Sequence, residues 1–241
     1  MASPPVPEEP STAVVVPIRS FDGALSRLAG ILGEARCRDL MVLMADRVLS
    51  AADPMPVHVA TDDAEVAAWA TDLGAAVVTA GRPGLTIAVA AAVDHLATAG
   101  VERAVVAHAD LALARTLRPA VGPGLTIVGD RRRDGSNVVC VPAAAGFQFS
   151  YGPGSFGRHV TEAERLGLDV NVVDDDSLSI DIDHPEDLAH LPEDLRGALG
   201  LDKRPSGLTQ LAGVLRSPRS EAVGCVALAW AARERSEQER E

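Results

Sequence analysis

The fold is decided by residues 57–108, which read VHVATDDAEVAAWATDLGAAVVTAGRPGLTIAVAAAVDHLATAGVERAVVAH. Short runs rich in Val and Ala alternate here with longer segments whose apolar residues recur at helical spacing. The predicted elements are a strand at 57–61, a helix at 63–73, a strand at 76–78, a helix at 86–99 and a strand at 104–108. Strands that alternate with helices through short connections predict βαβ units and a parallel sheet.

The same kind of pattern extends to both sides of this stretch. On the N-terminal side, the apolar run 13–18 predicts a buried first strand, and residues 36–52 have helical spacing. On the C-terminal side we expect strands at 125–128, 138–141, 147–151, 170–173 and 178–182, and a helix at 156–166. The Asp134-Gly135 pair is typical of a hairpin turn, and Pro185 is expected to open another helix at its first position.

The chain divides into three parts. Residues 1–12 are rich in Pro and acidic residues, which predicts a disordered N-terminal arm. Residues 13–200 predict one α/β domain, since a chain of 241 residues and 25.0 kDa is too short for two large ones. Residues 201–241 predict a C-terminal extension with a terminal helix and a charged tail.

Composition limits the location and the partners of the protein. Apolar residues make up 47% and aromatic residues only 3%, so we expect a core of Val, Leu, Ile and Ala, which suits parallel strands buried on both faces. The formal net charge of -12 argues against a nucleic-acid partner. No apolar stretch reaches the ~20 residues that span a bilayer, and no basic segment typical of a secretory signal is found. We therefore expect a cytoplasmic protein; its oligomeric state stays open, a homodimer included.

Two residue types exclude further classes of protein. Cys37, Cys140 and Cys225 lie far apart, which favours buried or free thiols over a disulfide or a zinc site. Lys203 is the only lysine in the sequence. Because a Walker-type phosphate-binding loop requires a lysine within a glycine-rich motif that is absent here, kinases and GTPases of the P-loop class are excluded.

Two aspartates share one face of the strand predicted at 178–182 and its continuation. The sequence Leu-Ser-Ile-Asp-Ile-Asp alternates strictly, so Asp181 and Asp183 would lie about 7 Å apart on the face opposite the apolar side chains. Aspartate is poorly suited to strands, but a divalent cation such as Mg²⁺ would remove the repulsion between two carboxylates. The alternative is a solvated acidic face, with Asp183 or His184 capping the next helix.

A third carboxylate follows the strand predicted at 104–108. Asp110 comes where an open α/β sheet binds its ligands, at the carboxyl end of a strand. It could instead cap a short helix. For His108 we favour a hydrogen-bonded core histidine over a metal ligand.

A glycine-rich turn, Gly152-Pro-Gly-Ser-Phe-Gly157, has three interpretations. It fits the dinucleotide-binding fingerprint, and Asp174 follows about twenty residues later, but such a fingerprint usually opens the first βαβ unit. It could be a tight turn with Ser155 as helix N-cap. It could also present N–H groups at a helix start to a phosphate or carboxylate. Arg131, Arg132 and Arg133 are expected to be solvated.

Five short motifs in one order resemble the family of 2-phospho-L-lactate and phosphoenolpyruvate guanylyltransferases, enzymes of deazaflavin coenzyme F-420 biosynthesis. No single motif is specific. The motifs are Val16-Pro-Ile-Arg19 with Ser26-Arg-Leu28, His108-Ala-Asp-Leu111, Asp134-Gly-Ser-Asn137, Tyr151-Gly-Pro-Gly-Ser155 with Arg158-His159, and Asp181-Ile-Asp183 with Pro185-Glu-Asp-Leu188. The resemblance covers roughly residues 13–192.

The resemblance implies a fold, a reaction and a set of site residues. The fold would be a Rossmann-like, GT-A-like nucleotidyltransferase fold, a mostly parallel central sheet with helices on both faces. The enzyme would transfer GMP from GTP to the phosphate of a three-carbon acid (phosphoenolpyruvate, 2-phospho-L-lactate or 3-phosphoglycerate) and release pyrophosphate. The implied site residues are Asp110, Asp181 and Asp183 for Mg²⁺, with Asp110 and Arg27 catalytic, Ser136, Gly152 and Ser155 for the acceptor acid, and Arg19 and Arg27 for the GTP phosphates.

This chain departs from the family pattern at four positions. Arg19 and Leu25 stand where the family has lysines, Ala112 stands where it has a proline, and Thr86 stands where it has an asparagine. The loss of a phosphate-binding lysine leaves open a second hypothesis, a non-catalytic nucleotide-binding paralogue. A third hypothesis is an NAD-dependent oxidoreductase built on the glycine-rich turn.

Overall fold

The computed structural model describes residues 10–201. The predicted terminal helix and charged tail, and residues 1–9 of the predicted arm, lie outside the described residues. The strands are β1 (Thr12–Pro17), β2 (Val57–Ala60), β3 (Ala76–Val78), β4 (Arg103–Ala107), β5 (Leu125–Gly129), β6 (Ser136–Pro142) and β7 (Val170–Val172). The helices are α1 (Ala29–Leu32), α2 (Glu34–Ala51), α3 (Ala64–Asp72), α4 (Leu85–Thr98), α5 (Ser155–Arg165), α6 (Asp176–Ser179) and α7 (Glu193–Ala198), with 3-10 turns η1 (Arg118–Ala120), η2 (Ala143–Ala145) and η3 (Pro185–His190).

The seven strands form one mixed sheet in the order β3-β2-β1-β4-β6-β5-β7. β1 pairs in parallel with β2 and with β4, and β2 pairs in parallel with β3. β6 runs antiparallel to both of its neighbours, β4 and β5, while β7 is parallel to β5. The parallel half and the antiparallel hairpin of β5 and β6 agree with the predicted organisation, and the carboxyl ends of β1 and β4 lie side by side.

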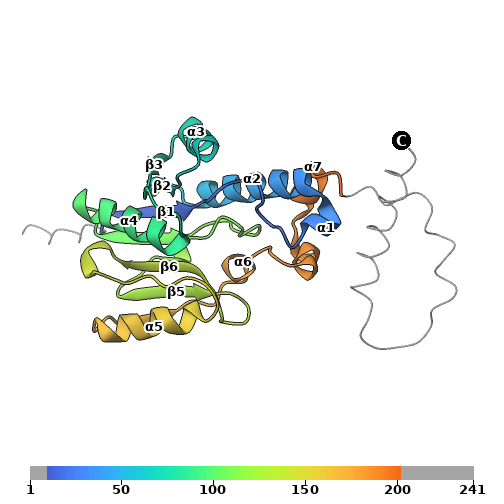
Figure 1. Cartoon of the computed structure of the whole chain (residues 1–241). Helices are drawn as coiled ribbons and strands as arrows, with labels where there is room; N and C mark the ends of the chain where they lie inside the picture. Colours follow the sequence, from blue (N-terminus) through green and yellow to red (C-terminus); the bar gives the residue numbers. More distant parts are fainter. Residues whose placement is uncertain (1–9, 202–241) are drawn as a thin grey trace, which may run out of the picture.

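Helices cover both faces of this sheet (Figure 1). The interior strand β1 shows the division, because its side chains alternate between two apolar clusters. Val14 and Val16 pack with the residues of α2 and α3, and Ala13 and Val15 pack with those of α4 and α5. The core consists almost entirely of aliphatic side chains, as the composition predicts. No helix within residues 10–201 is both long and apolar enough to cross a bilayer.

The predicted strand at 178–182 is wrong. Residues 176–179 form the short helix α6, and residues 180–183 are irregular. Asp175 explains the difference, because its side chain accepts a hydrogen bond from the Ser177 N–H and so caps the helix. Leu178 and Ile182 are still buried. The alternation of apolar residues predicted the burial correctly and the backbone conformation incorrectly.

Two further segments differ from prediction. Residues 147–151 form no strand, although Phe147 and Phe149 are buried against the face covered by α4 and α5. The helix predicted at Pro185 is the 3-10 turn η3, with the proline at its start as expected. The remaining predicted strands and helices are confirmed, with shifts of one or two residues at their ends.

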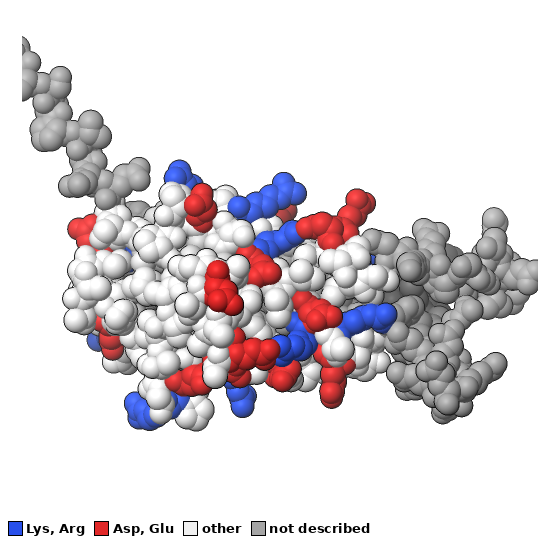
Figure 2. Space-filling model, turned by 90° about the horizontal axis from the view of Figure 1, so that it is seen from above, with Lys and Arg blue, Asp and Glu red and all other residues white. Residues whose placement is uncertain are grey.

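The surface combines both signs of charge. On the face seen in Figure 2, acidic and basic side chains are interspersed and form no continuous basic patch. Positive charge on this face is therefore local.

Candidate functional site

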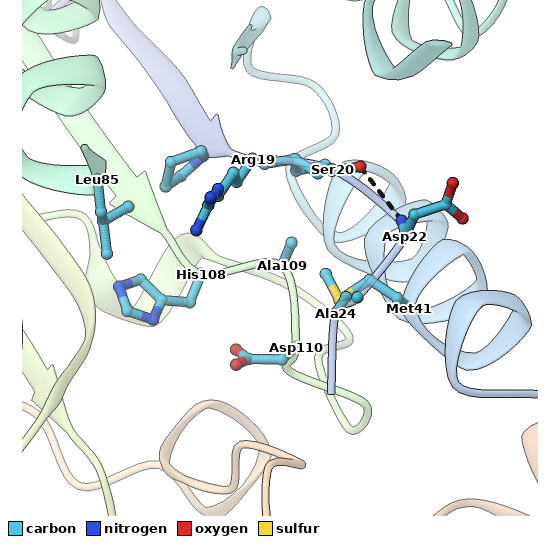
Figure 3. A pocket seen from close by; sticks show the side chains of 12 residues that line it. Arg19, Ser20, Asp22, Ala24, Met41, Leu85, His108, Ala109 and Asp110 are labelled. Atoms are coloured by element: carbon cyan, nitrogen blue, oxygen red, sulfur yellow. Dashed lines mark hydrogen bonds between the residues drawn. The ribbon is translucent and has the colours of Figure 1, made fainter. Parts of the chain in front are cut away.

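A pocket of about 440 Å³ opens at the carboxyl ends of β1 and β4 (Figure 3). These strands are parallel neighbours, so the loops that follow them meet at one edge of the sheet. Arg19, Ser20 and Asp22 line the pocket from the loop after β1, Leu85 lines it from the start of α4, and His108 and Asp110 line it from the loop after β4.

Arg19 supplies a positive charge to this pocket. Its side chain is exposed, and Figure 3 shows it extending from the end of β1 toward His108. Within residues 10–201, no carboxylate pairs with its guanidinium, whereas most other arginines near the site have an acidic partner. An unpaired guanidinium in a pocket is suited to an anionic group of a ligand.

The loop that carries Arg19 is anchored from outside the pocket. Ser20 Oγ accepts a hydrogen bond from the Asp22 N–H at 3.2 Å. The ring of Phe21 packs edge-on against Trp69 of α3, with 5.2 Å between the centroids. Arg38 of α2 donates to Asp22 at 2.7 Å. These contacts hold the loop against α2 and α3 and leave its inner side to the pocket.

Arg27, the other predicted phosphate contact, lies on the turn before α1 and does not line the pocket. Its guanidinium forms an ion pair with the Asp183 carboxylate. Leu25 precedes it, with φ +54 and a buried side chain. A leucine in the left-handed region is strained. The Leu25 side chain is packed into the core and therefore does not face the pocket.

Among the acidic residues near the pocket, Asp110 has the most strongly shifted pKa. Its Oδ1 atom is buried and has no hydrogen-bond partner. Burial raises the pKa of Asp110 to about 7, and the nearby carboxylates of Asp181, Asp183 and Asp187 contribute to the increase. No helix follows this residue, so it is not an N-cap. A bound cation would stabilise the charged form of such a group.

The acidic segment 181–183 is held next to Asp110 by the backbone. The Ile182 N–H donates to the Asp110 carbonyl oxygen at 3.1 Å, and the Ile182 side chain is buried. Asp181 and Asp183 flank this anchored residue. Burial raises the pKa of Asp181 as well. The three predicted metal ligands are therefore neighbours, although they are not on one strand face as the sequence suggested.

Their side chains do not form a ready metal shell. In residues 10–201, no group of three or more His, Cys, Asp or Glu side chains is arranged as metal ligands. The Asp183 carboxylate forms an ion pair with Arg27 instead. The unpartnered oxygen of Asp110 is nevertheless suited to a hard cation, which prefers carboxylate oxygens, so the magnesium site stays a prediction.

The predicted acceptor residues Ser136 and Ser155 are brought together. Both side chains are buried, and their hydroxyl oxygens lie 3.3 Å apart. His159, which the sequence reasoning gave no role, completes the group. Its Nε2 accepts from the Ser150 N–H at 2.9 Å, so its Nδ1 carries the proton and donates to Ser136 Oγ at 2.9 Å. Burial is the largest cause that lowers the pKa of His159, to about 4.

The start of α5 differs from the simple anion site proposed from sequence. Ser155 is not the N-cap; Gly154 takes that position with φ +73. The N–H groups of Gly154 and Phe156 donate to the Oδ1 and the carbonyl oxygen of Asp134, both at 3.1 Å. These donors are therefore engaged within the protein. Gly152 is exposed, with φ +105.

Arg158 supplies the positive charge of this turn, and sequence reasoning missed its part. Its guanidinium donates to Ser150 Oγ at 2.7 Å and to the carbonyl oxygens of Ser150 and Pro153 at 2.9 and 2.5 Å. It is exposed and, within the described chain, has no carboxylate partner. Because no strand precedes the turn, the structural context of a dinucleotide fingerprint is also missing.

His108 and Tyr151 connect the pocket to the turn at residues 152–155. Their ring centroids are 5.2 Å apart, and His108 Nε2 and Tyr151 Oη are both buried without hydrogen-bond partners. Burial lowers the pKa of His108 to about 4. His108 is thus a neutral histidine at the pocket wall, and the hydrogen bond expected for a core histidine is not formed at Nε2.

Comparison with known proteins identifies a family and relatives of this chain. The model of a family described as Guanylyl transferase CofC like matches residues 12–194. The chain is 33% identical to the phosphoenolpyruvate guanylyltransferase of Rubrobacter xylanophilus, over 75% of this chain and 93% of the relative. It is 35% identical to the 2-phospho-L-lactate guanylyltransferase of Halorubrum lacusprofundi, over 74% and 82%.

Solved structures support the fold alone. A Desulfovibrio desulfuricans protein described as a nucleotide-diphospho-sugar transferase superposes with a TM-score of 0.59 at 14% identity, covering 93% of this chain and 98% of its own. A nucleotidyl transferase from Methanothermobacter superposes with a TM-score of 0.50 at 16% identity, covering 78% and 99%. The predicted Rossmann-like nucleotidyltransferase fold is confirmed.

Proposed function

The chain belongs to the family of CofC-like guanylyl transferases, and on this premise we propose that it transfers GMP from GTP to the phosphate of a three-carbon phospho-acid. Pyrophosphate is the second product. The relatives are named for phosphoenolpyruvate and for 2-phospho-L-lactate, and we propose one of these as the acceptor. The reaction would belong to deazaflavin coenzyme F-420 biosynthesis.

The observation that carries this proposal is that one pocket contains both an unpaired cationic group and an unpaired carboxylate oxygen. Arg19 brings an unpaired guanidinium into it, and Asp110 brings a buried carboxylate oxygen without a partner. A nucleoside triphosphate with a bound cation satisfies both groups, because its phosphates pair with the arginine and its cation pairs with the carboxylate. A neutral ligand would satisfy neither.

Arginine is proposed to hold the triphosphate. About four negative charges of GTP must be accommodated by a protein of net charge -12, so local cations are required. Arg19 lines the pocket already, and Arg27 would contact the leaving phosphates after it leaves Asp183. Both would stabilise the charge that develops on pyrophosphate.

The acidic residues are proposed to hold magnesium. Asp110, Asp181 and Asp183 would be its protein ligands, and the ion, when bound, would polarise and neutralise phosphate oxygens. Asp187 is left out of this set because both of its carboxylate oxygens are already bound, Oδ1 by Arg131 and Oδ2 by the N–H groups of Asp183 and His184.

The acceptor is proposed to bind at the turn that begins α5. Ser136, Gly152 and Ser155 would contact its carboxylate or phosphate, and Arg158 would supply positive charge. An acceptor phosphate oxygen then attacks the α-phosphorus of GTP. As this bond forms, the bond from the α-phosphorus to the bridging oxygen breaks, and its electron pair leaves with pyrophosphate. The acceptor phosphate is already ionised near neutral pH, so the step needs no general base.

Pyrophosphate release tests the proposal when each nucleoside triphosphate is combined with each acid. We expect release with GTP and with either phosphoenolpyruvate or 2-phospho-L-lactate, and little with ATP, CTP or UTP; 3-phosphoglycerate serves as a third candidate acid. Release from GTP without any acid would indicate a hydrolase and would contradict the proposal.

A further inference from the structure

The run Arg131-Arg132-Arg133, expected to be solvated, connects the β5–β6 turn to the acidic region of the site. Each arginine has an acidic partner between residues 174 and 187. Arg133 pairs with Asp174 at 2.7 Å, and Arg132 approaches Glu186 at 3.9 Å. These two pairs are exposed, with side-chain exposures between 54 and 82%. Such surface pairs contribute little to stability.

The pair of Arg131 and Asp187 is different, because Asp187 is buried. Arg131 donates from Nη2 to Asp187 Oδ1 at 2.8 Å and from Nη1 to His190 Nε2 at 2.8 Å. The other oxygen of Asp187 accepts the N–H of His184 at 2.8 Å and that of Asp183 at 3.3 Å. Arg131 therefore holds the Asp187 carboxylate in place, and this carboxylate in turn holds the backbone at Asp183.

The β5–β6 turn also contacts the start of α5, where the acceptor is proposed to bind. Asp134 accepts the N–H groups of Gly154 and Phe156. Within the turn, Asp130 accepts the N–H groups of Arg132, Asp134 and Gly135 at 2.8 to 3.0 Å. The β5–β6 turn, residues 130–135, is thus an internally bonded unit that is attached to the proposed acceptor turn, residues 152–155, and, through Asp187, to the acidic segment 181–183.

We propose that Arg131 and Asp187 are positioning residues that set where Asp183 lies relative to Asp110 and to the acceptor turn. Neither residue would touch a substrate. The inference rests on the proposed function, because it assigns Asp183 to a metal site. Metal binding would then depend on Arg131, a side chain of the β5–β6 turn that acts on Asp183 through Asp187.

The test compares Arg131→Gln with Arg132→Gln in the full-length protein. The probe is Mn²⁺ alone, titrated without substrate and followed by the electron paramagnetic resonance of the free ion. We expect Arg131→Gln to weaken Mn²⁺ binding at least tenfold and to raise the Mg²⁺ concentration for half-maximal turnover equally. Arg132→Gln should stay within twofold of the parent. Arg131→Lys should recover part of the affinity, since it keeps the charge beside Asp187 and loses the bond to His190.

A second variant separates positioning from charge alone. If Arg131 acted only through its charge, its removal would leave the site more negative and would tighten Mn²⁺ binding, while Asp187→Asn would weaken it. Positioning predicts that both variants weaken it. Tighter or unchanged binding in Arg131→Gln overturns the inference.

The failure of the proposed metal site would look different. Asp183→Asn should abolish the Mn²⁺ binding seen in the parent. If the parent and Asp183→Asn bind Mn²⁺ equally, the metal assignment fails and the inference fails with it. If Asp183→Asn loses binding and Arg131→Gln does not, only the inference fails.

Discussion

Arg27 and Asp183 form an ion pair although 156 residues separate them in the sequence. The pair joins the turn before α1 to the acidic segment beside Asp110. In the proposed reaction both residues have other partners, a phosphate for Arg27 and a metal ion for Asp183. Binding of substrate in the proposed reaction would therefore exchange the partners of both residues.

Replacement of Arg27 by lysine should be costly, as should replacement by alanine. A guanidinium binds phosphate through two parallel donors, whereas an ammonium acts as a point charge. Loss of such a contact should weaken the transition state by ~1.5–3 kcal/mol, which corresponds to a roughly 10- to 150-fold lower kcat/KM for GTP. Steady-state kinetics measure this, with Arg165→Lys on α5 as the control. If both Arg27 variants keep kcat and the KM for GTP within twofold of the parent, Arg27 does not contact the triphosphate.

Asp183→Asn should keep the fold and abolish magnesium-dependent turnover. The residue is only partly buried, and the backbone around it is held by Asp187 and not by its own side chain. An amide is a weaker ligand for Mg²⁺ than a carboxylate. Thermal unfolding should therefore give a Tm near that of the parent, while kinetic assays should show no turnover. Asp176→Asn, at an exposed position in α6, is the control. Near-normal activity of Asp183→Asn would show that the metal assignment is wrong.

Ser155→Ala should weaken binding of phosphoenolpyruvate in the presence of Mg²⁺. The Ser155 hydroxyl lies against Ser136 in a buried site, and in the proposed complex its loss removes one hydrogen bond to the acid. Isothermal titration measures the affinity. Thr161→Ala, also on α5, is the control because the Thr161 hydroxyl bonds only its own helix. Micromolar binding of NAD with no response to phosphoenolpyruvate would support the oxidoreductase hypothesis instead.

Stability should fall as the pH decreases from about 6.5 to about 4, partly because of His159. Burial holds its folded pKa near 4, below the usual 6.5 of an unfolded histidine. Between these values the unfolded chain binds more protons, so unfolding becomes more favourable as the pH falls. His108 contributes with the same sign. Urea unfolding at several pH values should show a shallower dependence for His159→Gln than for the parent; equal slopes would contradict the role of His159.

Sequence patterns predicted the sheet well where the signals are local. The alternation in residues 57–108 predicted β2, α3, β3, α4 and β4 nearly to the residue, because Asp63 caps α3 and Gly84 marks the start of α4. The pattern at 178–182 failed because the same apolar spacing suits a buried short helix, and the cap at Asp175 decides between them. The sequence placed Asp110 at a strand end, where the pocket lies.

Other parts of the site depend on contacts that no local pattern contains. His159 lies between Ser136 and Ser150 only after β6 and α5 pack together. The pair of Arg131 and Asp187 spans 56 residues, and a run of three arginines gives no sign of which one meets a buried acid. The prediction of solvated side chains holds for all three arginines, which are exposed, but it did not include the pairing of Arg131 with the buried Asp187.

The central claim, that this protein joins GMP to a phospho-acid, is tested most directly by ³¹P NMR of a mixture with GTP, Mg²⁺ and phosphoenolpyruvate or 2-phospho-L-lactate. We predict that pyrophosphate appears in equal amount with a pair of coupled doublets from a new diphosphate linkage, and that Asp183→Asn produces neither. If GTP binds and its three resonances persist unchanged with both acids and with 3-phosphoglycerate, the protein is a nucleotide-binding paralogue without transferase activity, and the account is contradicted.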